Sequence, residues 1–365
     1  MCVLPLSLEQ AQGLSAKSDF QVFWGGPDRP ARLLRNLLEE KIHAVPSGGE
    51  ILWVTYYFRD VGLADALIKA SLRGVKVRLV IEGDPRTGAV NSQVLKLLQS
   101  SEAIGQIGVR ALKHRWIDNR FLRRCRLHEK LYYFSHPVAN VLVGTFNPSG
   151  NVPEDQEVID KIGDQDRGHN VLVDIKCADI VKHLYSHANH IFRACHGPWE
   201  RFLSKNNRVF CSGKTRVLFF PRSQWAVFNK LFESLTPDCT LRMAVSHLND
   251  RQFCKRLLLL AFQGVRIEML VHDTERRVPQ WTEKMLLHDN INFHRYVHPE
   301  SLPMHNKFML FEMPERRILS FGSLNLSVRS LHANHELLVI DETPELYEAF
   351  RNRWDDMLQE VIIPQ

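Results

Sequence analysis

The sequence lacks a hydrophobic stretch long enough to cross a membrane. A membrane-spanning helix needs about 18 or more consecutive apolar residues, whereas the densest apolar run covers only residues 257–262 and follows Lys255 and Arg256. The N-terminus also lacks the basic start and the longer apolar core of a secretory signal. We therefore expect a cytoplasmic protein, with peripheral attachment to the inner face of a membrane as the alternative.

The sequence also lacks the cysteine and histidine spacings of disulfide-rich and zinc-binding proteins. Its seven cysteines are scattered, and none of them forms a C-x-x-C pair. An odd, scattered set excludes a disulfide framework and favours a reducing compartment. Because no H-E-x-x-H or similar ligand spacing occurs either, we expect neither a metal nor another cofactor.

What is present is the composition of an ordinary globular protein. The 365 residues are 44% hydrophobic and 24% charged, enough for one large domain or two of usual size. The formal net charge of +6 suits an anionic partner but does not identify it.

The same order of strands and helices occurs twice along the chain. The clearest local match aligns residues 73–80 with residues 263–270, where a glycine precedes an alternating apolar strand in both. In the first copy the pattern predicts strands at 21–24, 51–57, 75–81 and 107–112 and helices at 32–42, 63–72 and 90–98. In the second copy it predicts strands at 216–220, 240–245, 265–271 and 292–297 and helices at 226–235, 252–263 and 282–287, before a C-terminal helix from 344 to about 358.

This alternation predicts an α/β fold made of two tandem α/β/α sandwich repeats with mixed sheets. We expect a lead-in over residues 1–20, a first repeat over 21–205 and a second repeat over 213–365. The offset between the copies drifts along the chain, as loop insertions in a duplicated unit would cause. The first repeat holds two such insertions, the basic-aromatic segment 113–127 and the acidic segment 150–167.

A short motif of polar residues occurs once in each half. It is a histidine and a lysine two positions apart, followed after a glycine turn by a hydroxyl residue and then an asparagine. Residues i and i+2 of a strand point to the same side, so each histidine and its lysine are expected to project together. The first copy is His128, Lys130, Thr145 and Asn147, and the second copy is His305, Lys307, Ser323 and Asn325.

Two such sets would form a receptor for a phosphate ester if the halves packed face to face. The lysines and amides would stabilise charge on the non-bridging oxygens. One imidazole could attack phosphorus while the other protonates the leaving oxygen, and this chemistry needs no metal. The sequence therefore predicts a single active site with pseudo-twofold symmetry.

The duplicated motif resembles the HKD motif of the phospholipase D superfamily, and the likeness covers residues 21–358. The second copy, which also has Glu312, Ser327, Arg329 and Glu336, is similar to the cardiolipin synthase-like branch. The resemblance implies two phospholipase D-like repeats and a covalent phosphohistidine that water or an alcohol resolves. On this basis the expected catalytic residues are His128, His305, Lys130, Lys307, Asn147, Asn325 and Glu336.

The first copy departs from the family pattern. Ser135 stands where an acid is usual, and Asn170 aligns with Glu336. By the resemblance, this glutamate orients the histidine of its own half, and a carboxylate partner favours the charged imidazolium. We therefore expect Glu336 to pair with His305 as the general acid. His128, paired with Asn170, would then be the nucleophile, unless a carboxylate of segment 150–167 replaces the missing charge.

The motif indicates the type of reaction, the cleavage or transfer of a phosphodiester, more clearly than it indicates the substrate. A phospholipid is the favoured substrate, because segment 113–127 could lie on an anionic bilayer. The same segment could grip a nucleic acid, so a metal-independent endonuclease acting on DNA or RNA is one alternative, and a catalytically weakened protein that binds anionic ligands is another. A tandem repeat can complete its site within one chain, which predicts a monomer. The residues expected to bind substrate are Thr145, Ser323, Asn170, Arg126 and Arg124.

Overall fold

The computed structural model describes residues 18–101, 107–112, 126–149, 164, 166–193, 209–221 and 226–362. Most of the predicted lead-in, most of segments 113–127 and 150–167, and much of the predicted boundary between the repeats lie outside these residues. Arg124 lies outside them too. Within the described part of the chain, no helix is both long and apolar enough to cross a bilayer.

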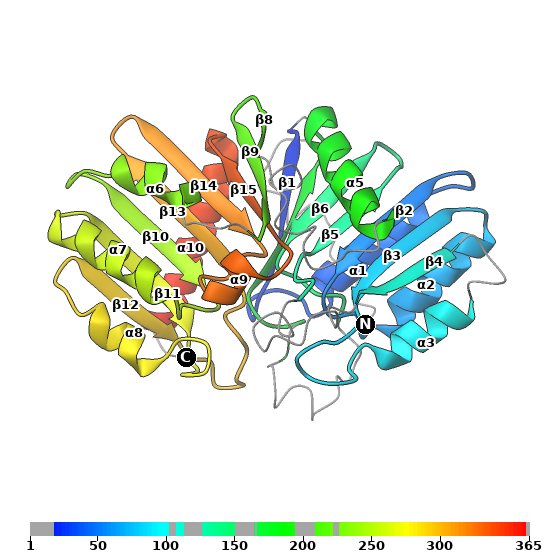
Figure 1. Ribbon diagram of the computed structural model, residues 1–365, viewed down its shortest axis with the longest axis horizontal. Helices are drawn as coiled ribbons and strands as arrows, with labels where there is room; N and C mark the ends of the chain where they lie inside the picture. Colours follow the sequence, from blue (N-terminus) through cyan, green and yellow to red (C-terminus); the bar gives the residue numbers. More distant parts are fainter. Residues whose placement is uncertain are drawn as a thin grey trace, which may run out of the picture.

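The first half forms a seven-stranded mixed sheet in the order β1-β7-β6-β5-β2-β3-β4 (Figure 1). Strands β2, β3 and β4 are parallel to one another, and the other neighbours are antiparallel. The strands are β1 (Phe20–Gly25), β2 (Glu50–Thr55), β3 (Lys76–Glu82), β4 (Ile107–Leu112), β5 (Leu131–Phe134), β6 (Asn140–Gly144) and β7 (Asn170–Ile175). The helices are α1 (Leu33–Ala44), α2 (Val61–Leu72), α3 (Ser92–Ser100) and α5 (Ala178–Arg193).

The second half repeats this order in an eight-stranded sheet, β12-β11-β10-β13-β14-β15-β9-β8, in which the short β8 is an added edge. The strands are β8 (Phe210–Ser212), β9 (Thr215–Phe220), β10 (Thr240–Val245), β11 (Arg266–His272), β12 (Ile291–Tyr296), β13 (Lys307–Met313), β14 (Arg316–Gly322) and β15 (Glu336–Asp341). The helices are α6 (Ala226–Glu233), α7 (Arg251–Phe262), α8 (Gln280–Met285), α9 (Val328–His332) and α10 (Pro344–Ile362). The predicted α/β fold with two tandem mixed-sheet repeats is confirmed.

Equivalent local signals start and stop the equivalent helices of the two halves. The side chain of Asp60 accepts a hydrogen bond from the Leu63 amide at 2.8 Å at the start of α2, and Asp250 does the same for Phe253 at the start of α7. After each helix a glycine takes a positive φ, +91° at Gly74 and +93° at Gly264, which only glycine adopts at low cost. The duplication is therefore visible in the backbone as well as in the sequence.

Helix α5 was not predicted from the sequence. Its buried side chains do recur at helical spacing, at Ile180, Val181, Leu184, Ala188 and Ile191. Three histidines, at 183, 187 and 190, stand among these apolar positions and hide the periodicity. One of them, His187, lies within 3.0 Å of the buried carboxylate of Glu129, between the motif residues of the first half.

The two halves share one hydrophobic core. Side chains of β1 and β7 lie in the same apolar cluster as side chains of β9 and β15. Figure 1 shows β1, β9 and β15 at the centre of the molecule. Helix α10 of the second half contacts β1 as well as its own sheet. Its buried Phe350 lies 4.7 Å from the Trp24 ring and 5.1 Å from the Phe308 ring, measured between centroids. This packing fixes one half against the other, as a site shared between them requires.

Candidate active site

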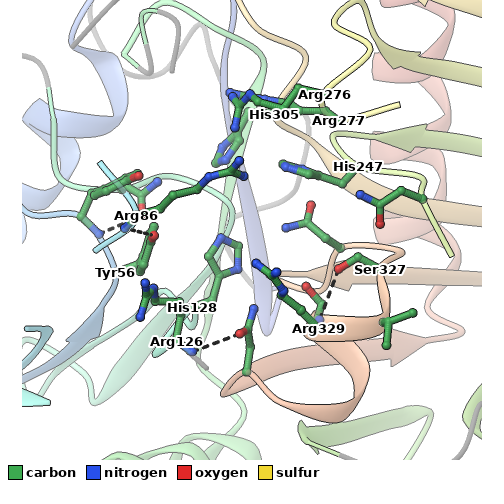
Figure 2. A pocket seen from close by; sticks show the side chains of 17 residues that line it. Tyr56, Arg86, Arg126, His128, His247, Arg276, Arg277, His305, Ser327 and Arg329 are labelled. Atoms are coloured by element: carbon green, nitrogen blue, oxygen red, sulfur yellow. Dashed lines mark hydrogen bonds between the residues drawn. The ribbon is translucent and has the colours of Figure 1, made fainter. Parts of the chain in front are cut away.

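Both motif histidines line a single cavity of about 720 Å³. Asn147 and Asn325 line it as well, so residues far apart in the chain meet as the duplicated motif predicts (Figure 2). The cavity is lined by segments that follow β2, β3, β6, β10, β11 and β14 and by segments that precede β5, β13 and β15.

Backbone hydrogen bonds between the halves fix the approach to each histidine. The His128 amide donates to the His335 carbonyl at 2.9 Å, and the His335 amide donates to the Arg126 carbonyl at 2.8 Å. At the equivalent place, the His305 amide donates to the His169 carbonyl at 3.1 Å, and the His169 amide donates to the Pro303 carbonyl at 3.0 Å. Each pair of segments forms an isolated parallel bridge.

Because of these bridges, each motif histidine is paired with a residue of the other half of the chain. Nδ1 of His128 lies 2.8 Å from Oε2 of Glu336, and Nδ1 of His305 lies 2.7 Å from Oδ1 of Asn170. The expectation that Glu336 orients His305 of its own half, and Asn170 orients His128, was therefore wrong. The physical reason is local: Glu336 follows His335 and Asn170 follows His169, and each of those residues is bridged to the segment of the other half's histidine.

A hydroxyl side chain holds each of these partners in place. Ser323 donates to Oε2 of Glu336 at 2.6 Å and accepts from the Leu337 amide. Thr145 donates to Oδ1 of Asn170 at 3.2 Å and accepts from the Val171 amide at 2.9 Å. Thr145, Ser323 and Asn170 thus position the histidines from behind, and their direct contact with substrate stays a prediction.

The same contacts fix which ring nitrogen carries the proton. The Asn170 amide nitrogen donates to the Gly168 carbonyl at 3.2 Å, so its oxygen faces His305 and accepts from Nδ1–H of that ring. Glu336 accepts from Nδ1–H of His128 in the same way. In both neutral rings Nε2 therefore carries a lone pair for the cavity.

Both histidines favour the neutral form. Burial lowers the pKa of His128 to about 4, although the nearby Glu336 carboxylate opposes the shift. Burial also lowers the pKa of His305 well below its usual value, and the charges of Lys307 and Lys130 lower it further. Burial alone would raise the pKa of Glu336, but His128, Lys130 and Ser323 outweigh it and keep that carboxylate ionised.

The two motif lysines are buried behind the histidines. Nζ of Lys130 donates to the His128 carbonyl at 2.8 Å, and Nζ of Lys307 donates to the His305 carbonyl at 2.7 Å. Burial lowers the pKa of Lys130 to about 7, and burial together with Lys130 lowers the pKa of Lys307 well below its usual value. A substrate anion would relieve this unfavourable concentration of positive charge.

Arginines dominate the rest of the cavity wall. Arg126, predicted to bind substrate, lines the cavity, and its guanidinium lies 3.5 Å from Asp84. No carboxylate is among the described residues that line it. Several lining residues lie outside the motifs and were not predicted from the sequence, namely Tyr56, Tyr57, Arg86, His247, Arg276 and Arg277. Their position in the sequence could have indicated them. Each follows a strand of the parallel part of its sheet, and α/β proteins bind ligands at the carboxyl ends of such strands.

Comparison with protein families gives two matches within the chain. The family model described as "Cardiolipin synthase, PLD-like domain" matches residues 45–165 and 237–358, which together make up more than half of the chain. Each match includes one histidine motif. The mitochondrial cardiolipin hydrolase of Danio rerio is 26% identical over 136 residues, which are 37% of this chain and 58% of that protein. The matched part thus spans less than two thirds of that relative.

Solved structures share the fold over most of the chain. The phosphatidylserine synthase of Haemophilus influenzae Rd KW20 has a TM-score of 0.67 at 12% identity, covering 93% of this chain and 86% of that chain. The polyphosphate kinase of Porphyromonas gingivalis has a TM-score of 0.60 at 15% identity, covering 93% of this chain and 50% of that chain. At these identities the likeness establishes the fold alone.

The depressed pKa of His128 predicts a contribution to acid unfolding. The folded state holds His128 neutral down to about pH 4, whereas an unfolded histidine binds its proton near pH 6.5. The stability that comes from this difference is complete above pH 6.5 and is lost as the pH falls towards 4. His128→Asn should therefore lessen the fall in the free energy of unfolding between pH 6.5 and 4, measured by urea denaturation.

The exposed His43 on α1 provides the matched control for the loss of one imidazole, because it does not line the cavity. The slope of stability against pH in His128→Asn is compared with that in His43→Asn. An unchanged slope in His128→Asn would contradict a neutral, buried His128.

Proposed function

Because the chain belongs to the phospholipase D superfamily, with two copies of the cardiolipin synthase PLD-like domain, we propose that it is a metal-independent phosphodiesterase or phosphatidyltransferase that forms a covalent phosphohistidine. One observation carries the proposal. Two imidazoles, one from each half and each anchored at Nδ1, line one cavity with arginines and without a carboxylate among the described lining residues. That arrangement suits an anionic ester that two opposed groups attack and protonate.

His128 is the proposed nucleophile. When its Nε2 bonds to phosphorus, the ring becomes positively charged, and the ionised Glu336 at 2.8 Å from Nδ1 stabilises that charge. On the equivalent nitrogen of His305, the partner among the described residues is the neutral amide of Asn170. His128 was also the nucleophile expected from the sequence, but for a different reason. The sequence-based expectation gave His128 a neutral partner, whereas the proposal here rests on its carboxylate partner, Glu336.

His305 is the proposed general acid. It takes up a proton as the phosphodiester anion enters, because that negative charge opposes the depression of its pKa by burial and by the lysines. A neutral amide holds an imidazolium weakly, so His305 releases the proton readily to the leaving oxygen. Lys130, Lys307, Asn147 and Asn325 would meanwhile stabilise charge on the non-bridging oxygens.

The reaction runs in two balanced steps. In the first, the bond from Nε2 of His128 to phosphorus forms, the bond from phosphorus to the leaving oxygen breaks, and His305 gives that oxygen its proton. In the second, water or an alcohol loses a proton to His305 and attacks phosphorus, and the nitrogen–phosphorus bond breaks. The cycle restores both histidines.

A phospholipid is the proposed substrate. The family description and the name of the Danio rerio relative both concern cardiolipin, which supports this choice over a nucleic acid. Attachment of segment 113–127 to an anionic bilayer is part of the proposal, and Arg126 and Leu127 are the described residues of that segment.

Trapping the covalent intermediate tests the assignment of the histidines. With a p-nitrophenyl phosphodiester, whose leaving group departs without an acid, His305→Asn should still be phosphorylated and should accumulate the adduct, because nothing deprotonates the water of the second step. His128→Asn should form no adduct. Peptide mapping by mass spectrometry should place the phosphoryl group on His128, with turnover reduced by roughly 10²–10⁴-fold in His305→Asn. An adduct on His305 would overturn the assignment.

Substrate class can be tested in EDTA with three preparations, namely phosphatidylglycerol liposomes, single-stranded DNA and double-stranded DNA. We expect release of glycerol, or formation of a transfer product, from the liposomes alone and loss of that activity in His128→Asn. Cleavage of DNA without a lipid product would replace the lipid proposal by the endonuclease alternative. Binding without turnover of any of the three would support the alternative of a weakened anion-binding protein.

A further inference from the structure

Three arginines form a cluster at one part of the cavity. Arg86 follows β3 in the first half, whereas Arg276 and Arg277 follow β11, the equivalent strand of the second half. Figure 2 shows Arg276 and Arg277 beside His305, with Arg86 reaching towards them, while Arg126 and Arg329 lie beside His128. The cavity is thus basic on both sides of the histidine pair.

The three guanidinium groups are close enough to repel one another. Burial and the charges of Arg276 and Arg86 lower the pKa of Arg277 to about 10, with partial compensation from Asp273. Burial and the charge of Arg86 also lower the pKa of Arg276. The compensating Asp273 is itself bound to Nδ1 of His272 at 2.6 Å. Concentrating like charges in this way costs stability, and an anionic ligand would offset that cost.

Both loops that carry the cluster are anchored to the fold. The Arg86 amide donates to the hydroxyl of Tyr56 at 2.9 Å, and the next residue, Thr87, shares a 2.8 Å hydrogen bond with Tyr57. In the other half, the Leu248 amide donates to the Arg277 carbonyl at 3.1 Å. The arginines are therefore presented from fixed positions, as a preformed anion site requires.

The three arginines add more positive charge and more hydrogen-bond donors than one reacting phosphate needs. In the proposed reaction, the histidines, lysines and asparagines of the two motifs supply the groups that act on the reacting phosphoryl group. The cluster lies on the side of His305, beside which Figure 2 shows Arg276 and Arg277. In the proposed reaction His305 faces the leaving oxygen, so a second anionic group bound there belongs to the leaving group.

Building on the proposed function, we propose that Arg86, Arg276 and Arg277 form a second anion subsite that binds a phosphate carried by the leaving group. The preferred substrates are then phosphodiesters whose leaving alcohol itself bears a phosphate or phosphodiester group. Guanidinium groups suit this task because their paired N–H donors match phosphate oxygens.

Two short-chain lipids that differ in one group test the subsite. Dioctanoyl phosphatidylglycerophosphate loses glycerol phosphate, whereas dioctanoyl phosphatidylglycerol loses glycerol, and the reacting phosphodiester is the same. The wild-type protein should show the higher kcat/KM for the phosphorylated lipid. Arg276→Gln should lower the ratio of the two kcat/KM values by about 10- to 100-fold, as expected for the loss of one charge-assisted contact.

Arg266→Gln is the matched control. Arg266 is exposed on β11 and pairs with Glu268 outside the cavity, so its replacement removes the same charge and should leave both rates and their ratio at wild-type values. A ratio that stays constant in Arg276→Gln would overturn the subsite while the proposed function stands. Arg86→Gln repeats the test from the other half of the chain, and circular dichroism verifies that both variants fold.

Binding of inorganic phosphate tests for the subsite independently of catalytic turnover. Calorimetric titration with inorganic phosphate should give two ions per wild-type chain and one per chain in the Arg86→Gln, Arg276→Gln double variant. One ion per wild-type chain would overturn the inference. If neither lipid reacts, the lipid proposal fails, and the phosphate stoichiometry still decides whether a second anion subsite exists.

Discussion

The site depends on two short backbone bridges that join the halves of the chain. One ties residues 127 and 335 together, and the other ties residues 169 and 304. Each bridge places the first residue of a strand in one half, β15 or β7, next to the motif histidine of the other half. Without them, the two repeats would each hold a histidine and a lysine but no fixed partner for the ring. The apolar core shared by β1, β7, β9 and β15 supplies the packing that keeps these bridges closed.

Each histidine is paired with a residue of the other half, and the two partners differ chemically. The nearly symmetric scaffold therefore holds a chemically asymmetric site. Both halves use the same geometry of hydroxyl, partner and imidazole, but the partner is a carboxylate for His128 and an amide for His305. One imidazole can therefore carry a stabilised positive charge, and the other holds a proton only weakly. A single difference, Asn170 in place of a glutamate, distinguishes the two proposed roles. Burial and the nearby lysines favour the neutral form of both rings.

Local signals in the sequence predicted most of the fold. Apolar periodicity located strands such as 107–112 and 240–245 as the structure has them, and the repeated histidine motif predicted one shared site. Helix α5 was missed because histidines interrupt its buried face. The partner of each histidine was missed for another reason: the pairs join residues 208 and 135 positions apart, and only the packing of the two halves decides between partners in the same half and partners in the other. Arg86, Arg276 and Arg277 of the cavity wall belong to loops without periodicity, so their convergence depends on the same packing.

In this site Glu336 contacts the ring of His128, and Asn170 contacts the ring of His305. Nuclear magnetic resonance of ¹⁵N-labelled histidine reads these contacts directly through the Nδ1–H proton of each ring, assigned by its loss in His128→Asn or His305→Asn. We predict that Glu336→Gln shifts the His128 proton and leaves the His305 proton in place, whereas Asn170→Ala does the reverse. A shift of the His305 proton, with an unmoved His128 proton, in Glu336→Gln would contradict this pairing.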